Sequence, residues 1–250
     1  TSIVSGPATY FDGRLYVPLS SFEVAAAGLP THECCRTHGG IAALDATTGN
    51  PLWRFDTTAQ ASKTYVNRDG VQMWGPSGAV VWNAPTIDAK RGALYFGTGQ
   101  NSSSPATDTS DSIIALDLKT GAKRWIFQAL ADDAWNAACL SGGASCPKEN
   151  GPDFDFGAPV MLVRRDKGDL LLAGEGVAVL LVLALAPPGL GGVALLDGGL
   201  VGVPLLLPQP PGLVDGPVQR RLAGIADGEG LRVSRVRRQR DRERSRGDGD

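Results

Sequence analysis

Hydrophobic and polar positions alternate in two stretches of the chain that share one template. Residues 40–55 read GIAALDATTGNPLWRF and residues 112–127 read SIIALDLKTGAKRWIF. In each copy an alternating apolar segment leads into Asp-x-x-Thr-Gly and then into a segment that carries Trp and Phe. Asp and Thr side chains stabilise tight turns by bonding to the turn's own backbone, and Gly supplies positive φ. The pattern predicts a β-hairpin with a large aromatic plug, present twice.

The spacing of the two copies indicates a repeat architecture. Asp45 and Asp117 are 72 residues apart, whereas one four-stranded propeller blade takes roughly 40 to 50 residues. We therefore expect an insertion loop or a second, degenerate blade between them. An isolated hairpin is marginal in water, but blades packed around an axis bury each other's faces. The fold class predicted for residues 1–174 is all-β, a partial β-propeller.

The composition changes near residue 175. Residues 175–250 contain no Lys, Asn, Thr, His, Cys, Met, Phe, Tyr or Trp and consist mainly of Gly, Leu, Val, Ala, Pro, Arg and Asp. A stretch of 76 residues without an aromatic side chain is not expected to continue a fold whose blades each need a Trp. We expect a low-complexity, non-propeller tail at 175–250.

Three interpretations of this tail compete. Residues 177–186 fit a buried strand or helix, which Pro187 and Pro188 would end. The arginine-rich residues 232–246 fit a nucleic-acid-binding segment, although runs of mixed charge are more often solvated and disordered. Out-of-frame translation of GC-rich DNA produces the same set of residues, and we favour this third interpretation.

Charge and hydropathy narrow the classes of partner. The net charge of -2 and the pI near 5.7 give no reason to expect nucleic acid or a membrane surface. Every apolar run falls short of the roughly 18 residues that span a bilayer. The chain opens at Thr1 without a signal-peptide pattern, so we expect an internal piece of a longer protein.

The four cysteines fall into two local pairs, Cys34 with Cys35 and Cys139 with Cys146. Neither pair has C-x-x-C spacing, and the chain has only two His, so a structural zinc site is poorly supported. Local pairing of an even number of cysteines favours disulfides and an oxidising compartment such as a bacterial periplasm. The alternative is four unrelated buried thiols.

Several segments together resemble the alcohol dehydrogenases that depend on pyrroloquinoline quinone (PQQ). They are the Ala-Leu-Asp-x-x-Thr-Gly-x-x-x-Trp repeat, the adjacent cysteines, and WNAPTIDAKRGALYFGTGQN at residues 82–101. Within that family, PTHECC (30–35) and NGPDFDFGAP (150–159) look most like the polyvinyl alcohol dehydrogenases. The resemblance covers residues 1–174. It implies part of an eight-bladed periplasmic propeller that holds PQQ and calcium on its axis and passes electrons to cytochrome c.

The resemblance also implies which residues contact PQQ. The family holds the flat quinone between a Trp and a disulfide of adjacent cysteines. Trp82 matches the Trp because it stands 18 residues before Gln100; the alternative is an ordinary core Trp. Cys34 and Cys35 match the disulfide, although the pair stands later in the chain than in the methanol-oxidising relatives. His38 stands where an Arg often precedes the Gly of the repeat.

Calcium takes hard oxygen ligands and, beside PQQ, acts as a Lewis acid on the quinone carbonyl. Glu33 stands near the position of the family's ligand Glu, with one residue of slippage. The family's ligand Asn follows Gly-Thr-Gly, and here Gln100 and then Asn101 follow it. The fourth candidate ligand is Asp155.

Asp155 is also the candidate general base, because Phe154-Asp155-Phe156 matches the family's Trp-Asp-Tyr segment. Flanking aromatic rings would desolvate the carboxylate and raise its pKa towards the range needed to remove an alcohol proton. Asp153 is a nearby competitor, and an Asp that only caps a turn is the structural alternative. The family's Lys near the quinone falls beyond residue 174, where this chain has no Lys.

The resemblance implies a fragment of an enzyme, a PQQ- and calcium-dependent dehydrogenase that oxidises the secondary hydroxyls of an alcohol or polyol, polyvinyl alcohol in particular. A different class is a non-catalytic β-propeller scaffold that binds proteins, which would need neither the adjacent cysteines nor the Asp155 segment. A third possibility is an inactive, truncated or frameshifted product, since an open partial propeller exposes strand edges and inter-blade faces.

Overall fold

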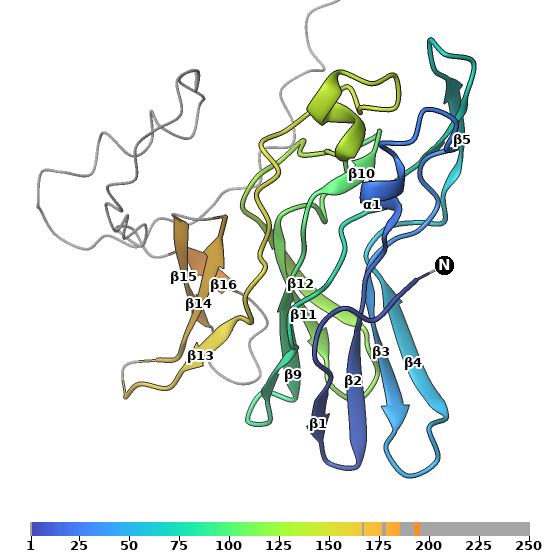
Figure 1. The fold of residues 1–250 in the computed structure, drawn as a ribbon. Helices are drawn as coiled ribbons and strands as arrows, with labels where there is room; N and C mark the ends of the chain where they lie inside the picture. Colours follow the sequence, from blue (N-terminus) through green and yellow to red (C-terminus); the bar gives the residue numbers. More distant parts are fainter. Residues whose placement is uncertain (1, 167, 177–178, 186–192, 196–250) are drawn as a thin grey trace, which may run out of the picture.

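The computed structural model describes residues 2–166, 168–176, 179–185 and 193–195. Within these residues, three four-stranded antiparallel sheets follow one another along the chain and stand side by side (Figure 1). Strands adjacent in each sheet are also neighbours in sequence within that sheet, as in the blades of a propeller. The expected all-β fold is confirmed.

The elements have the following bounds. The first sheet contains β1 (Thr9–Phe11), β2 (Arg14–Leu19), β3 (Gly40–Asp45) and β4 (Pro51–Asp56). The second contains β8 (Thr86–Asp88), β9 (Ala93–Gly97), β11 (Ser112–Asp117) and β12 (Lys123–Gln128). The third contains β13 (Met161–Val163), β14 (Leu170–Glu175), β15 (Val179–Leu185) and β16 (Val193–Leu195). Outside them lie β5 (Ser62–Val66), β6 (Gln72–Gly75), β7 (Ser77–Gly78), β10 (Asn101–Ser103), helix α1 (Glu23–Ala26) and the 3-10 helix η1 (Ala137–Ser141).

The two sequence repeats form equivalent hairpins, β3–β4 and β11–β12. Oδ1 of Asp45 and of Asp117 accepts hydrogen bonds from two backbone N–H groups and the Thr hydroxyl of its own turn, at 2.8–3.0 Å. Gly49 and Gly121 have φ of 74° and 73°, a conformation that a side chain would disfavour. The predicted turn chemistry is confirmed.

An insertion, not a degenerate blade, separates the first two sheets. After β4 the chain forms the β5–β6 hairpin, and β7 pairs with β10. The chain then enters β8 and β9, which are the first two strands of the second sheet. The long spacing between the repeats is therefore explained by β5, β6 and β7, which lie outside the four-stranded sheets, together with β8 and β9, the first two strands of the next sheet.

The second sheet is buried on both faces. Strand side chains alternate between faces, so Leu94 and Phe96 of β9 pack towards the first sheet, with Tyr16 and Ile41. Tyr95 belongs to the other cluster, which holds residues of the third sheet. Each fully buried large apolar side chain stabilises the fold by roughly 1.5–3 kcal/mol. Mutual burial of neighbouring sheets therefore supplies most of the core.

The repeat tryptophans occupy matching places in these two clusters. Trp53 lies 5.8 Å from the ring of Tyr16, and Trp125 lies 5.8 Å from the ring of Tyr95, centroid to centroid. Both indoles are half-buried at the edge of their cluster. Each Trp thus covers the Tyr on the second strand of its own sheet, which explains why the aromatic plug recurs with the hairpin.

The third sheet runs past residue 174, where the sequence led us to place a boundary. β14 pairs with β15 from Leu170↔Ala184 to Glu175↔Val179, and β16 pairs with β15. An aromatic residue is not required for such pairing, because the backbone supplies the hydrogen bonds and buried Leu183 and Leu185 supply the apolar contact. Residues 179–185 of the apolar run thus form a strand, whereas Pro187, Pro188 and residues 196–250, including the arginine-rich 232–246, lie outside the described residues.

No helix in the described part of the chain has the length and hydropathy needed to cross a membrane.

A buried ion-pair cluster joins the second and third sheets. Asp88, which is fully buried, accepts hydrogen bonds from Arg91 at 2.9 Å, Arg164 at 2.7 Å and the Tyr95 hydroxyl at 3.1 Å. Both arginines also bind Asp169, at 2.6 and 2.7 Å. Burial alone would raise the pKa of Asp88, but these donors outweigh it and lower that pKa. The cluster is satisfied only when the two sheets are docked.

Replacing one member of this cluster should be costly. In Asp88→Asn, the largely buried Arg91 and the more exposed Arg164 both lose a charged partner, so we expect the free energy of unfolding to fall by about 3 kcal/mol. Urea unfolding followed by circular dichroism measures the change. The matched control is Arg54→Gln, which removes a partly exposed ion pair with Asp56 and should cost about 1 kcal/mol or less. Equal effects of the two substitutions would contradict the assignment.

Candidate functional site

The segment that carries Asp155 packs directly against Gly97-Thr98-Gly99 at the end of β9. We call these three residues the Gly-Thr-Gly seat. A Cβ on Gly99 would lie 2.0 Å from Asp155 Oδ1, and a Cβ on Gly97 would lie 2.3 Å from the Cβ of Phe156. Either contact is closer than atoms approach, so both glycines of Gly-Thr-Gly are needed for this packing. The backbone N–H of Gln100 donates to Asp155 Oδ1 at 3.1 Å. The motif therefore positions the predicted base.

Three further carboxyl groups lie close enough to this segment for their charges to interact with one another and with Asp155. Asp111 directly precedes β11, Asp133 follows β12, and Glu175 ends β14. All three are at least 95% buried. Both carboxylate oxygens of Asp111 and of Asp133, and Oε1 of Glu175, have no hydrogen-bond partner within the described chain. Buried acceptors without donors are unfavourable, and they are often completed by a ligand, an ion or water.

The pKa values in this cluster are raised by burial and by mutual repulsion. Burial, followed by the charges of Asp133, Asp155 and Glu175, raises the pKa of Asp111 to about 11. Burial and Asp153 raise the pKa of Asp155 to about 7, although the Gln100 N–H acts in the opposite direction. Burial, Asp133 and Asp155 raise the pKa of Glu175 to about 7. The ionised carboxylates of this cluster repel one another, and a bound cation would offset their negative charge.

Sequence reasoning missed Asp111, Asp133 and Glu175 as site residues. A signal existed for Glu175, because LLLAGE (170–175) is an apolar strand that ends in a carboxylate. The signal for Asp111 is weaker, because the sequence shows only that it stands immediately before the second repeat. We find no local sequence signal for Asp133.

The two predicted amide ligands differ in their availability. Asn101 is fully buried, its Nδ2 donates to Ser77 O at 2.8 Å, and its Oδ1 accepts from the Thr107 backbone at 2.7 Å. The Asn101 amide therefore ties Ser77 to the segment around Thr107, and both of its polar atoms are already used. The Oε1 of Gln100 is buried and has no protein partner in the described residues, so Gln100 has the free oxygen that a ligand role requires.

Trp82 lies beside the same segment. A Cβ on Gly157 would lie 3.2 Å from the indole Nε1 of Trp82. The next residue, Asn83, donates to the carbonyls of Gly97 at 2.9 Å and Phe156 at 2.7 Å. The structure thus brings Trp82, the Gly-Thr-Gly seat and the Asp155 segment together, and Trp82 remains half-exposed.

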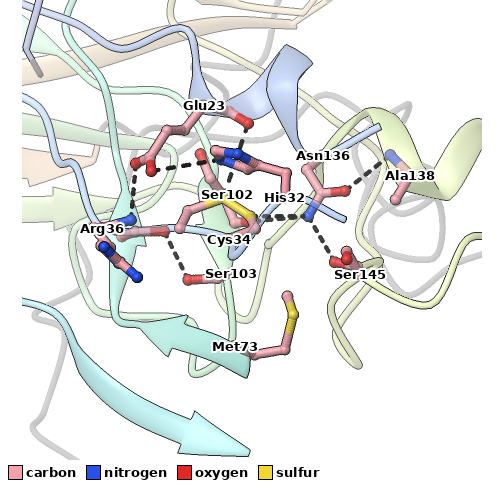
Figure 2. The surroundings of a disulfide bond; sticks show 12 residues. Glu23, His32, Cys34, Arg36, Met73, Ser102, Ser103, Asn136, Ala138 and Ser145 are labelled. Atoms are coloured by element: carbon pink, nitrogen blue, oxygen red, sulfur yellow. Dashed lines mark hydrogen bonds and ion pairs between the residues drawn. A yellow bond between two sulfur atoms is a disulfide. The ribbon is translucent and has the colours of Figure 1, made fainter. Parts of the chain in front are cut away.

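The adjacent cysteines form the expected disulfide, and Cys139–Cys146 forms the second one. The Cys34–Cys35 pair is fully buried, packed with Met73 and Ala27. Figure 2 shows Asn136 beside it, with Nδ2 3.8 Å from Cys34 Sγ and donating to Ser145 O at 2.8 Å. The prediction of two local disulfides is confirmed. The buried face of the first is not open for stacking in the described chain.

Two predicted site residues make other contacts. Glu33 is exposed, pairs with Arg36 and accepts from the indole N–H of Trp74 at 3.1 Å. His38 is buried and its Nε2 lies 3.3 Å from Asp56 Oδ1. Neither contact connects them to the carboxyl cluster, so their cofactor and metal roles remain predictions.

A second glutamate, not anticipated from the sequence, binds the loop that follows the cysteine pair. Glu23 Oε2 accepts from the backbone N–H of Arg36 at 2.8 Å and from Thr37, and Oε1 lies 3.7 Å from His32 Nε2 (Figure 2). Glu23 therefore fixes the loop that follows Cys34 and Cys35.

Comparisons with known proteins agree with this arrangement. Residues 24–140 match the PQQ family model described as glucose/ethanol/alcohol dehydrogenase, beta-propeller domain. The chain is 42% identical over 191 residues to a polyvinylalcohol dehydrogenase of Sphingopyxis sp. (strain 113P3), covering 74% of this chain and 29% of that protein. The chain belongs to the PQQ-dependent alcohol dehydrogenase family.

Other relatives are consistent with this family. A polyvinylalcohol dehydrogenase of Pseudomonas sp is 38% identical over 174 residues, covering 69% of this chain and 27% of that protein. The chain therefore spans less than a third of the length of these relatives. The crystal structure of quinohemoprotein alcohol dehydrogenase from Comamonas testosteroni superposes with a TM-score of 0.50 at 19% identity, over 81% of this chain and 32% of that chain. That likeness supports the partial propeller fold alone.

The described residues fit the family's two cofactors to different degrees. For calcium, the unpartnered oxygens of Gln100, Asp133 and Glu175 are the hard donors that the ion prefers. In the described part of the chain no three His, Cys, Asp or Glu side chains converge on one point, so amide or cofactor oxygens would complete the shell. For PQQ, half-exposed Trp82 offers a ring face.

The carboxyl cluster predicts an inverted dependence of stability on pH. The pKa values of Asp155 and Glu175 rise from 3.8 and 4.5 to about 7 on folding, so the folded chain binds these protons more tightly than the unfolded chain. Their stabilising contribution is complete below the unfolded values and is lost as pH rises through about 7. We expect the free energy of unfolding to fall between about pH 5 and pH 8.

Calcium at millimolar concentration should restore the loss at the higher pH, because it binds the ionised folded cluster. Urea unfolding at both pH values, with and without calcium, measures this, and Glu175→Gln should shrink the pH effect. Stability that rises with pH over this range, or no response to calcium, would contradict the assignment.

Proposed function

We propose that the intact protein containing this chain is a PQQ- and calcium-dependent dehydrogenase that oxidises secondary hydroxyl groups, those of polyvinyl alcohol in particular. One observation carries the proposal. Asp155 is held against Gly99 in a buried carboxyl cluster, and its pKa is raised to about 7, where a general base works best. The two relatives named polyvinylalcohol dehydrogenase supply the substrate class.

In this proposal Asp155 accepts the proton of the substrate hydroxyl through its carboxylate. The Gln100 N–H holds Oδ1, and the Gly99 seat prevents the carboxylate from turning away. Bound PQQ supplies the two-electron acceptor for the hydride of the carbinol carbon, so that the alcohol becomes a ketone. Asp111, whose pKa is about 11, stays protonated and leaves one fewer charge beside the base.

Calcium in this proposal is held by oxygens of Gln100, Asp133 and Glu175, with Asp155 nearby, and its charge would lower the raised pKa values of the cluster. Glu33 and Asn101 are the other candidate ligands from the sequence. Trp82 would cover one face of the quinone. Because its sulfurs are buried, the Cys34–Cys35 disulfide would then support the site through packing and would not contact the quinone directly.

We also propose that the protein works in the periplasm and passes its electrons to cytochrome c. Two disulfides, which persist in oxidising compartments, support the location. The electron acceptor follows from the family resemblance alone.

Asp155→Asn tests the proposed base. In the full-length protein supplied with PQQ and calcium, alcohol-dependent reduction of a dye should fall by about a hundredfold to ten-thousandfold, while PQQ still binds. Asp153→Asn is the matched comparison, because Asp153 is the neighbouring carboxylate that competes for the role of base and adds its charge to the site. If Asp155 is the base, this variant should retain activity within about fivefold.

Two outcomes would overturn the proposal. If Asp155→Asn keeps the native rate, the base is another group. If the full-length protein binds no PQQ, the protein is a non-catalytic propeller scaffold.

A further inference from the structure

An open groove lies outside the three sheets, at the end of the molecule where Figure 1 shows β5. Its volume is about 470 Å³, which is within the range of roughly 300–1,000 Å³ for ligand pockets. One wall is residues 65–68 of the β5–β6 hairpin, and the other is residues 142–150, which include the end of the loop closed by Cys139–Cys146. Both walls belong to segments that the proposed chemistry does not use.

The lining combines apolar surface with hydrogen-bond donors. Val66 is 60% exposed, and the half-buried Tyr65 and Ala144 add apolar surface. Arg68 donates to the carbonyl of Gly142 across the groove, and the Lys148 ammonium lies 5.8 Å from the Tyr65 ring centroid. Glu149 belongs to the second wall, but its carboxylate accepts hydrogen bonds from Ser104 and from the Ala106 N–H, and no carboxylate is among the described residues that line the groove. The contacts of Arg68 and Lys148 are with neutral groups, a carbonyl and a ring face, so both side chains can also donate hydrogen bonds to the oxygens of a ligand that lies along the apolar wall.

Both walls rest on the structure around the adjacent cysteines. Tyr65 packs against the cluster of Cys34, Cys35 and Met73. Asn67 Nδ2 donates to Ser145 Oγ at 3.2 Å, which ties the hairpin to the second wall. The Asn136 amide contacts both that wall and the Cys34 sulfur. The groove is therefore fixed in place relative to the disulfide, and it does not depend on a flexible contact.

We propose that this groove binds a segment of an extended, uncharged chain that bears hydroxyl groups, and so holds a polymeric substrate beside the site. The inference rests on the proposed function, because it identifies where the proposed polymeric substrate binds. A chain of alternating methylene and carbinol groups presents carbon to Tyr65, Val66 and Ala144 and hydroxyl oxygens to Arg68 and Lys148. Repeated units held in the groove raise the effective concentration of hydroxyls at the site.

A tryptophan that fills the groove tests this binding directly. Fluorescently labelled polyvinyl alcohol should bind the native chain without cofactor, and Ala144→Trp should weaken binding by about tenfold or more, measured by fluorescence anisotropy. The matched control, Ala46→Trp, places the same side chain in the exposed β3–β4 turn and should bind as the native chain does. Val66→Asp, on the opposite wall, should weaken binding independently of any disturbance at Ala144.

Ionic strength separates the two kinds of occupant. Binding of an uncharged polymer should be insensitive to salt, whereas an acidic partner would dissociate as salt screens the cations. Native affinity in both groove variants, or polymer binding that vanishes with salt, would overturn the proposal.

Kinetics of the full-length holoenzyme distinguish this inference from the proposed function. Ala144→Trp should raise KM for polyvinyl alcohol by about fivefold or more while kcat, and the kinetics with isopropanol, stay unchanged. If isopropanol is oxidised and KM for the polymer does not move, the groove proposal fails and the proposed function stands. If the polymer binds the groove but no alcohol is oxidised, the proposed function fails instead.

Discussion

Burial of the second sheet between its two neighbours is the interaction on which the other features depend. Leu94 and Phe96 face one cluster and Tyr95 faces the other, so removing either neighbouring sheet would expose a complete apolar face. The Asp88 cluster crosses one of these interfaces and is satisfied only when both sheets are present. A single hairpin repeat therefore has little stability of its own, and its conformation is specified by its neighbours.

The same packing makes the carboxyl cluster possible. Asp111 and Asp133 flank the last two strands of the second sheet, and Glu175 ends a strand of the third. Sheet docking removes all three from water, and the Asp155 segment closes over Gly97 and Gly99. Burying several like charges together opposes folding, and only the apolar interfaces on both sides compensate for it. A strained, charged site of this kind is expected where binding of a cation or a substrate recovers the energy.

Sequence patterns predicted local features well and long-range ones poorly. The Asp-x-x-Thr-Gly turns and the two disulfides depend on residues close together in the chain, and the structure confirms both. Gly99 and Asp155 were each noticed, but their contact spans 56 residues and no periodicity encodes it. The same limit hid Asp133 and made Glu33 a more visible candidate than Glu23. The third sheet extended past residue 174 because strand pairing uses the backbone, which composition does not report.

The insertion between β4 and β8 separates two tasks within one chain. Repeat hairpins build the sheets and position Asp155, whereas the β5–β6 hairpin and the loop closed by Cys139–Cys146 build the groove outside them. These segments meet the site through the buried surroundings of Cys34–Cys35, by way of Tyr65 and Asn136, and through Glu149, which binds Ser104 and the Ala106 N–H after β10. Changes in the groove lining therefore alter which molecules are held without disturbing the interfaces that bury the carboxyl groups. Such a division, with a rigid scaffold for chemistry and added loops for selection, is the usual way in which one fold serves many substrates.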